Sequence, residues 1–450
     1  MRPGCILFVI IPVAFLISCC APGTATAPIP ATLTVTKSST ATQTVSPDWL
    51  TPSPTPAQTP TDLATLAADQ THLELWENLS PEQSRALRQE ATDFQREHPA
   101  TTFTIHHYEE NETLIDALGT EEPEGSLLIL GNARLLRTLH QKNLLHPLDE
   151  LLTKSEMADL APLARISATQ DGRLWGLADT LGFHLLLYYN RDMIAVPPTN
   201  TEELSSVARS FTTPRERWGL AVNSYDPLWV VPWLSTCGDW LIDARGKPTL
   251  DTPAMVAALS LYRDWHTKRD GIAPLAAYHE ARQLFAEGQA AMLIDGEWVL
   301  GELRAAARVN WDVSVLPARD KSECHATPLV MGRYWMVRRA VRPEVQRVTV
   351  DFLQHVFTPE RQLSWAMRFG VLPTHRRALQ DSRILNDPWL RISAQQMQAG
   401  RALPLGVDAD RLLDAMRAPL RAMLDEDITP EETARSMQKN LGEYSWNSRP

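Results

Sequence analysis

The chain has 450 residues, more than a single hydrophobic core usually organises, so its length predicts two domains. Lysine and arginine number 43 against 54 aspartate and glutamate, and the resulting net charge of -11 argues against nucleic acid and anionic lipid headgroups as partners. Hydrophobic residues make up 44% of the chain and charged residues 22%, which is ordinary globular composition with enough apolar material for sizeable cores.

The five cysteines, Cys5, Cys19, Cys20, Cys237 and Cys324, contain no CxxC pair, and no histidine cluster has metal-ligand spacing. We therefore expect neither a metal nor a cofactor. In an oxidising compartment Cys237 and Cys324 could form a disulfide, or they could remain two separate buried thiols. The sequence leaves these two alternatives open.

The N-terminus has the layout of a secretory signal peptide. One basic residue, Arg2, precedes an apolar run over residues 6–17, which is too short to span a bilayer comfortably. The run ends in Leu-Ile-Ser followed by Cys19, which resembles the bacterial lipobox, whose cysteine is acylated and becomes the new N-terminus. We therefore predict that residues 1–18 are removed and that Cys19 carries the lipid anchor. The alternatives are acylation of Cys20 and a plain signal peptide without a lipid.

The segment that follows is rich in threonine and proline. Residues 20–70 contain 13 Thr and 8 Pro, with Trp49 as the only aromatic residue. Such a segment cannot bury enough apolar surface to fold. We predict that residues 19–70 form a disordered tether, which gives a lipid-anchored protein reach above the outer face of the membrane.

From Thr71 onward, short apolar runs alternate with capped helical stretches. Residues 80–83, Ser-Pro-Glu-Gln, supply an N-cap, a first-turn proline and a capping-box glutamine, and Leu87, Ala91 and Phe94 then share one helical face. Strands are predicted at residues 72–76, 101–107, 126–130, 184–190, 291–294, 311–316 and 329–337, and further helices begin near residues 200, 253, 343, 359 and 430. This alternation predicts an α/β fold with a largely parallel sheet.

Four segments carry a more specific signal. Residues 285–298 follow the pattern F-x-x-G-x-A-A-M-x-x-x-G-x-W, and residues 188–192 read Y-Y-N-R-D. Residues 145–149 and 197–204 match G-x-L-x-P-L-D and P-P-T-T-W-x-E-L in part. Together these segments resemble the maltose-binding-protein-like extracellular family 1 of solute-binding proteins from ABC importers, and the resemblance spans roughly residues 71–444.

This resemblance implies a two-lobed periplasmic-binding-protein-like fold (type II), with hinge-linked lobes and a cleft between them. The first lobe would take residues 71–181 plus 325–378. The second would take residues 182–324 plus 379–450. Ligand that bridges such a cleft favours the closed state through contacts that the open state lacks.

Sugars present hydroxyl groups and apolar ring faces, so a sugar-binding cleft needs carboxylate or amide groups and aromatic platforms. Trp298 matches a family position that commonly lines the cleft, and the segment around Pro232 is preceded by an acidic and an aromatic residue at positions where family members contact ligand. Other candidates follow predicted strands or adjoin a predicted crossing between lobes. For each candidate the alternative is core packing or a solvated loop. The candidate ligand-binding residues are Trp298, Asp226, Trp229, Glu77, Asn78, Asn132, Asp179 and Trp335.

Only one of the adjacent Tyr334 and Trp335 is expected to face the cleft, because strand side chains alternate. Trp233, Trp240 and Trp365 are expected in the core.

We predict an extracellular solute-binding lipoprotein, a monomer, that delivers a carbohydrate to the transmembrane subunits of an ABC importer. No HExxH or G-x-S-x-G motif occurs, so we expect no enzyme activity. One alternative is a binding protein for a non-sugar solute such as a polyamine, a glycerol phosphate or a peptide. Another is a sensor or adhesin lipoprotein on the same fold.

Overall fold

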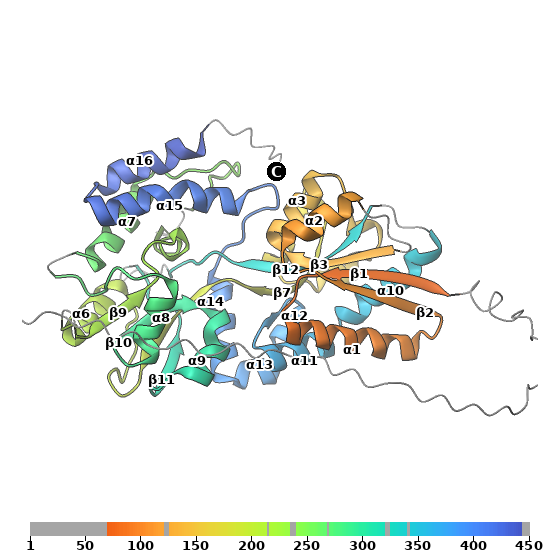
Figure 1. The fold of residues 1–450 in the computed structure, drawn as a ribbon, viewed down its shortest axis with the longest axis horizontal. Coiled ribbons are helices and arrows are strands. Elements are labelled where there is room, and N and C mark those ends of the chain that lie inside the picture. The colour runs from red at the N-terminus through yellow and green to blue at the C-terminus, as the bar shows by residue number, and fades with distance from the viewer. Residues whose placement is uncertain are drawn as a thin grey trace, which may run out of the picture. The chain divides into compact units, whose positions relative to one another are not determined.

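The computed structural model describes residues 70–120, 126–213, 216–234, 240–267, 270–319, 325–339 and 343–442 (Figure 1). All of them belong to one compact unit, Thr61–Pro450. The predicted signal peptide, the predicted anchor Cys19 and the tether up to residue 69 lie outside the described residues. Cys237 and Cys324 lie outside them too.

Among the described residues, seven strands form one sheet, four form a second and two form a small hairpin. The strands are β1 (Thr71–Glu77), β2 (Thr101–His107), β3 (Ser126–Asn132), β4 (Leu145–His146), β5 (Thr169–Gln170), β6 (Arg173–Leu174), β7 (Leu177–Gly182), β8 (Leu185–Asn190), β9 (Trp218–Val222), β10 (Ala290–Gly296), β11 (Trp311–Ser314), β12 (Met331–Arg338) and β13 (Leu372–Pro373). The seven strands predicted from the sequence are present, with ends that shift by up to two residues.

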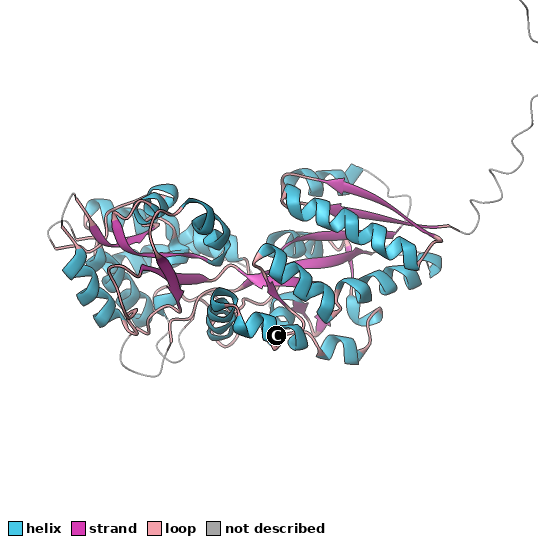
Figure 2. Cartoon of the chain, turned by 90° about the horizontal axis from the view of Figure 1, so that it is seen from below, coloured by secondary structure: helices cyan, strands magenta, loops and turns pink. Residues whose placement is uncertain are grey.

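Helices flank the strands of both larger sheets (Figure 2). The α-helices are α1 (Pro81–Glu97), α2 (Asn111–Thr120), α3 (Ala133–Gln141), α4 (Lys154–Ala158), α5 (Pro162–Ala168), α6 (Thr201–Phe211), α7 (Pro253–Trp265), α8 (Tyr278–Ala286), α9 (Leu300–Ala306), α10 (Pro343–Val356), α11 (Pro359–Phe369), α12 (Arg376–Leu379), α13 (Ser382–Asn386), α14 (Pro388–Ala399), α15 (Ala409–Glu426) and α16 (Pro430–Leu441). Short 3₁₀ turns are η1 (Leu148–Glu150), η2 (Pro227–Trp229), η3 (Val231–Leu234) and η4 (Glu297–Val299). Within the described part of the chain, no helix combines the length and the hydropathy that a membrane span requires.

Helix α1 begins where the capping pattern predicts. The Ser80 side chain accepts a hydrogen bond from the Gln83 amide, and the proline at the first helical position needs no intrahelical partner for its nitrogen. Leu87, Ala91 and Phe94 are all buried, so the apolar stripe faces the first sheet.

The prediction of a largely parallel sheet is wrong, because both larger sheets are mixed. The first has the order β13-β7-β12-β3-β1-β2, with β4 also paired to β12, and only the β1–β2 and β1–β3 pairs are parallel. Strand β12 enters antiparallel between β3 and β7. In the second sheet, order β11-β8-β10-β9, only β10 and β9 are parallel. The βα pattern predicts the parallel arrangement of β1, β2 and β3 correctly. It does not indicate that β12, which follows the strands of the second sheet in the chain, pairs within the first sheet.

The chain passes between the two sheets at three places. Phe183 and His184 connect β7 of the first sheet to β8 of the second, and we call these two residues the first crossing. The chain returns between β11 and β12, and it passes again between α14 and α15 (Figure 1). Strands β7 and β12 therefore belong to the first sheet and adjoin the crossings at one of their ends.

Each larger sheet has its own main hydrophobic core, and the second sheet also contributes to a separate, smaller cluster that includes Leu186 and Tyr188. Trp76, Trp335 and Phe352 lie in the first, and Trp233 and Trp265 lie in the second. The predictions that Trp233, Trp240 and Trp365 are core residues are confirmed by their burial.

Helices α13 and α14 place Ile384, Leu390, Ala394 and Met397 in the first core. Trp389 and Ile392 of α14 instead pack against a smaller cluster of the second sheet, so α14 contacts both halves. The predicted lobe boundaries therefore stay a proposal.

Candidate functional site

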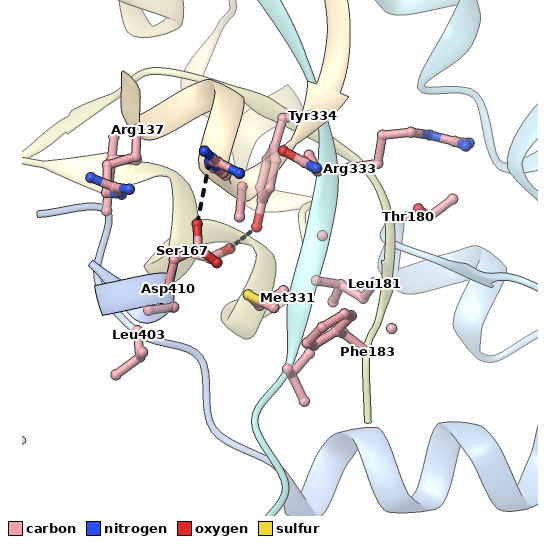
Figure 3. A pocket seen from close by; sticks show the side chains of 18 of the residues that line it. Arg137, Ser167, Thr180, Leu181, Phe183, Met331, Arg333, Tyr334, Leu403 and Asp410 are labelled. Atoms are coloured by element: carbon pink, nitrogen blue, oxygen red, sulfur yellow. Dashed lines mark hydrogen bonds and ion pairs between the residues drawn. The ribbon is translucent and has the colours of Figure 1, made fainter. Parts of the chain in front are cut away.

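A cavity of about 410 Å³ lies beside the first sheet, next to the first crossing and the start of α15 (Figure 3). Strand residues from β7 and β12 form part of its wall, including Thr180, Arg333 and Tyr334. The first turn of α3 and the segment that leads into α15, residues 403–410, supply much of the rest. Its volume falls within the range of about 300–1,000 Å³ that is usual for small-molecule sites.

Two asparagine amides line the cavity on the side of the first sheet. Asn111 donates from Nδ2 to Asn132 Oδ1 over 3.1 Å, and Asn132 Oδ1 also caps α3 by accepting from the Leu135 amide. Asn78 Nδ2 donates to Asn111 Oδ1 over 2.6 Å from outside the cavity. The structure therefore brings the predicted Asn132 to the cavity and places Asn78 behind Asn111, which the sequence analysis did not single out.

Strand β12 resolves the choice between its two adjacent aromatic residues. Tyr334 lines the cavity and donates its hydroxyl to Ser167 Oγ over 2.7 Å (Figure 3), and burial raises the pKa of Tyr334 to about 12. Trp335 faces the other side of the sheet, where it is buried in the first core. Its indole nitrogen donates to Asp179 over 3.1 Å.

Asp179 is fully buried and its carboxylate is occupied by cations. Burial alone would raise its pKa, but the charges of Arg361 and Arg333 outweigh burial and lower the pKa to about 2. Arg333 Nη2 lies 2.6 Å from Asp179 Oδ2, and Arg361 also donates to this carboxylate. Asp179 and Trp335 therefore hold β7 and α11 to β12 without reaching the cavity, and Arg333 is the member of this network that lines it.

Glu77 is also buried away from the cavity. Its carboxylate accepts from the Leu79 amide and the Ser84 hydroxyl, each over 2.6 Å, and lies 3.2 Å from His107 Nδ1. These bonds join the end of β1 to the start of α1 and to β2. We therefore leave Glu77 out of the proposed site.

Charged side chains from α3 and from the start of α15 lie at one side of the cavity. Arg137 on α3 pairs with Asp408, with 2.8 Å between Nη1 and Oδ2. Arg134 lies 2.6 Å from Glu112 and 3.6 Å from Asp410. Burial, followed by the charge of Asp408, raises the pKa of Asp410. Figure 3 shows Arg137 and Asp410 on this side.

Aromatic surface comes from the first crossing and the segment after β10. Phe183 lines the cavity, and its ring packs on Trp298 with 5.2 Å between centroids. Trp298 is 40% exposed and donates from Nε1 to the Tyr278 hydroxyl over 2.5 Å. Trp298 thus adjoins the cavity through Phe183 rather than lining it directly.

Glu297 lines the cavity beside Phe183, and the sequence analysis missed it. Burial raises its pKa to about 7, even though the Phe183 amide hydrogen-bonds its carboxylate. Glu297 lies between Gly296 and Trp298 of the family-like pattern over residues 285–298. That pattern allows any residue at position 297, so it gave no reason to select Glu297.

Asp226 and Trp229 lie in the second lobe away from the cavity. Asp226 accepts from the Leu228 amide over 3.0 Å and lies 3.6 Å from Arg417 Nη1. Trp229 is buried and donates to the Ile294 carbonyl over 2.6 Å. Trp229 also contacts Tyr278, so it supports the partner of Trp298 from behind.

Among the described residues, no group of three or more His, Cys, Asp or Glu side chains is placed to hold a metal ion. The cavity offers amides, hydroxyls, aromatic rings and paired charges. Such groups can bind and orient a polar ligand by hydrogen bonding and ring contact.

Comparison with known families and relatives gives consistent results. The family model described as bacterial extracellular solute-binding protein matches residues 89–391. The chain is 24% identical over 342 residues to the maltotriose-binding protein of Pyrococcus abyssi, covering 73% of this chain and 72% of that one. It is 21% identical over 283 residues to the maltooligosaccharide ABC transporter solute-binding lipoprotein of Streptococcus pneumoniae, covering 59% of this chain and 63% of that relative, or less than two thirds of its length.

Solved structures show the same fold. The maltose/maltodextrin-binding domain of Bdellovibrio bacteriovorus bound to maltotriose has a TM-score of 0.68 at 26% identity, covering 82% of this chain and 98% of that one. A cyclo/maltodextrin-binding protein complexed with maltotetraose has a TM-score of 0.73 at 18% identity, covering 85% and 99%. These likenesses confirm the predicted two-lobed, periplasmic-binding-protein-like α/β fold of type II.

Proposed function

Because the chain belongs to the family of bacterial extracellular solute-binding proteins, we propose that it binds a carbohydrate in the cavity beside the first crossing and delivers it to an ABC importer. The observation that carries the proposal is the cavity wall. Asn111 and Asn132 present amides, Tyr334 presents a hydroxyl, and Phe183 presents an aromatic ring to the same space. Sugar hydroxyls and apolar sugar faces need these two kinds of group.

The charges around the cavity favour a neutral ligand. Each of the three cavity arginines has a carboxylate partner: Arg134 pairs with Glu112 and Asp410, Arg137 with Asp408 and Arg333 with Asp179. An anionic ligand such as a glycerol phosphate would have to compete for these guanidinium groups, and a polyamine would have to compete for the acids. A sugar needs neither exchange.

Relatives support the choice of carbohydrate, since the two described above are a maltotriose-binding protein and a maltooligosaccharide-binding lipoprotein. The test is isothermal titration calorimetry of the full-length protein with maltotriose, spermidine and glycerol 3-phosphate. We expect maltotriose alone to bind, with a dissociation constant in the micromolar range, which corresponds to a binding free energy of about -8 kcal/mol. Binding of spermidine instead would identify a polyamine-binding protein, and binding of glycerol 3-phosphate a glycerol phosphate-binding protein.

The aromatic pair gives the site-specific arm of this experiment. Phe183→Ala and Trp298→Ala should each weaken maltotriose binding, by about tenfold or more for a ring that packs on the sugar or supports one that does. Trp175→Ala is the matched control, because this part-exposed indole contacts His140 outside the cavity. Equal affinity in all three variants would show that the ligand binds elsewhere.

We also propose that the protein is a monomer held on the outer face of the membrane by lipid on Cys19, and that it binds and releases its ligand without catalysis. The lipobox-like sequence before Cys19 supports the anchor. Metabolic labelling with radioactive palmitate tests it. Cys19→Ser should abolish labelling and release the protein from membranes, whereas Cys20→Ser should not. Loss of labelling in Cys20→Ser and not in Cys19→Ser would assign the anchor to Cys20. No labelling of the wild type would favour a plain signal peptide without a lipid.

Delivery to an importer is tested in living cells. Deletion of the gene should abolish uptake of radioactive maltotriose, and the wild-type gene should restore it. Normal uptake in the deletion strain would favour the alternative of a sensor or adhesin on this fold.

A further inference from the structure

The first crossing contains a strained residue. Phe183 has a φ of 65°, in the left-handed region that residues with a bulky side chain rarely adopt. Such a conformation is energetically unfavourable and persists only where surrounding contacts hold it. Contacts from other segments must therefore hold Phe183 in this conformation.

Glu297 forms hydrogen bonds with both residues of the first crossing. Its Oε1 accepts a hydrogen bond from the Phe183 amide over 2.8 Å. Its own amide donates to the His184 carbonyl over 3.1 Å. Glu297 follows β10 of the second sheet and is 114 residues from Phe183, so these two bonds fasten the crossing to the second lobe.

The residue before the crossing leaves room for this carboxylate. A Cβ atom at Gly182 would lie 2.2 Å from Glu297 Oε1, so any side chain there would displace the carboxylate from the Phe183 amide. The contact between Glu297 and the crossing therefore depends on a glycine at position 182.

The crossing also carries the aromatic wall of the cavity. Phe183 lines the cavity and packs on Trp298, the residue directly after Glu297. The backbone bonds made by Glu297 and the ring contact made by Trp298 thus fix the same residue from two sides.

We propose that Glu297 is a positioning residue, which holds Phe183 in its left-handed conformation and so places the Phe183 ring in the ligand cavity. The effect on ligand affinity rests on the proposed function of that cavity. The effect on the first crossing does not, because it concerns the protein without ligand.

The surroundings of Glu297 make this contact sensitive to pH. Glu297 Oε2 lies 3.9 Å from His184 Nδ1, and neither atom has a hydrogen-bond partner among the described residues. Burial raises the pKa of Glu297 to about 7 and lowers that of His184 to about 3. The charge of Asp295 raises the Glu297 pKa further. The titratable groups that act on Glu297 are His184 in the first crossing, Tyr188 on β8 and Asp295 on β10. Asp295 in turn faces Tyr278 and Arg282 on α8 and Glu302 on α9.

The direction of the pH effect follows from linkage. Opening of the crossing returns Glu297 to water, where its pKa is the ordinary 4.5 rather than about 7. The closed crossing therefore binds more protons between these two values, and opening becomes easier as the pH rises through this range. A glutamine at position 297 keeps an oxygen for the Phe183 amide but cannot titrate.

Hydrogen–deuterium exchange of the full-length protein without ligand tests the proposal. Exchange is followed in the peptide that spans β7 and β8, at pH 6 and pH 8, after correction for the intrinsic effect of pH. We compare the wild type with Glu297→Ala, Glu297→Gln and the matched control Glu287→Ala, which removes an exposed carboxylate that does not line the cavity.

We expect Glu297→Ala to exchange at least tenfold faster than the wild type at both pH values. Glu297→Gln should stay protected and should lose the wild type's faster exchange at pH 8, and Glu287→Ala should match the wild type. Wild-type protection in Glu297→Ala, or equally fast exchange in the alanine and glutamine variants, would overturn the proposal.

Two further arms keep the test decisive. If Glu297→Ala unfolds globally, adding Phe183→Gly should restore part of its melting temperature, because glycine adopts a positive φ without strain. No restoration would overturn the proposal. Titration with maltotriose is run in parallel, and we expect Glu297→Ala to bind it at least tenfold more weakly. If the wild type itself does not bind maltotriose, the carbohydrate assignment fails, while the exchange data still decide the role of Glu297.

Discussion

Arg137 on α3 and Asp408 before α15 form an ion pair that joins the first core to the second beside the cavity. Their Nη1 and Oδ2 atoms are 2.8 Å apart, and the two side chains are only 13% and 15% exposed. Leu136 and Leu139 anchor α3 in the first core, and Leu412 anchors α15 in the second. The pair therefore contributes to holding the lobes together beside the cavity.

Loss of this pair should favour the open arrangement of the lobes. We expect Arg137→Met and Asp408→Asn to raise the radius of gyration in small-angle X-ray scattering and to weaken maltotriose binding about fivefold, for a coupling on the order of 1 kcal/mol. Asparagine can still cap α15 by accepting from the Arg411 amide, as Asp408 does. Arg96→Met is the control, because Arg96 is 68% exposed, pairs with Asp93 on the same helix and does not line the cavity. Equal effects of Arg96→Met and Arg137→Met would contradict the assignment.

The stability of the protein should fall as the pH rises towards neutrality. The pKa of Glu297 is about 7 in the folded chain and 4.5 ordinarily, so the folded state binds more protons in between. The corresponding stability is fully present below pH 4.5 and is lost as the pH rises through about 7, by an amount of about 1–3 kcal/mol.

Burial also raises the pKa of Asp295 to about 7, so its effect has the same sign. Melting temperatures at pH 5 and pH 8 should therefore differ less in Glu297→Gln than in the wild type. Glu287→Gln, on the surface, should behave as the wild type. An unchanged difference in Glu297→Gln would show that Glu297 does not titrate in this range.

Asp179→Asn should be strongly destabilising, because it leaves the buried Arg361 with one carboxylate partner fewer and takes the partner from Arg333. Breaking a buried ion pair in this way costs about 3–5 kcal/mol, which urea unfolding at pH 7 will measure.

The same carboxylate should support stability on the acid side. The pKa of Asp179 is about 2 against an ordinary 3.8, so its contribution is present above pH 3.8 and is lost as the pH falls through about 2. The wild type should therefore lose more stability than Asp179→Asn over this range. Asp381→Asn, which alters an exposed pair with Arg383, should not change the urea midpoint. A small effect of Asp179→Asn would mean that water reaches the network.

Gly182→Ala should disturb the first crossing although both Glu297 and Phe183 are left unchanged. The new methyl group would lie 2.2 Å from Glu297 Oε1, so the carboxylate must move off the Phe183 amide, and loss of that hydrogen bond should destabilise the protein by about 1–3 kcal/mol. Gly301→Ala is the matched control, since nothing lies within 4 Å of its added Cβ and alanine favours the helix α9. Urea unfolding should show a lower midpoint for the first variant and an equal or higher one for the second.

The strand positions could be predicted because each strand has a local pattern, whereas their arrangement could not. Residues 126–130 and 184–190 are apolar runs between turn signals, and both are strands in the structure. The position of β12 between β3 and β7 depends on contacts across some 150 to 200 residues, which no local periodicity records.

The site was less predictable for a related reason. Glu77 and Asp179 looked like ligand groups because they end or adjoin strands, but both are buried against partners that only the fold brings near. Asn132 does line the cavity, since it begins α3 at the carboxyl end of β3. Glu297 was missed because the Phe183 amide that it binds is 114 residues away in sequence.

The order of the strands also constrains how the chain can be made. Strand β7 pairs with β12 and β13, and within the first sheet both of these partners are encoded long after it. A ribosome that adds about 5–20 residues per second needs roughly 8–30 seconds to proceed from β7 to β12. During that time the growing chain carries the unpaired edges of β7, which are available to the wrong partner. A message truncated anywhere between these strands would therefore yield an incomplete first lobe as well as an unfinished second one.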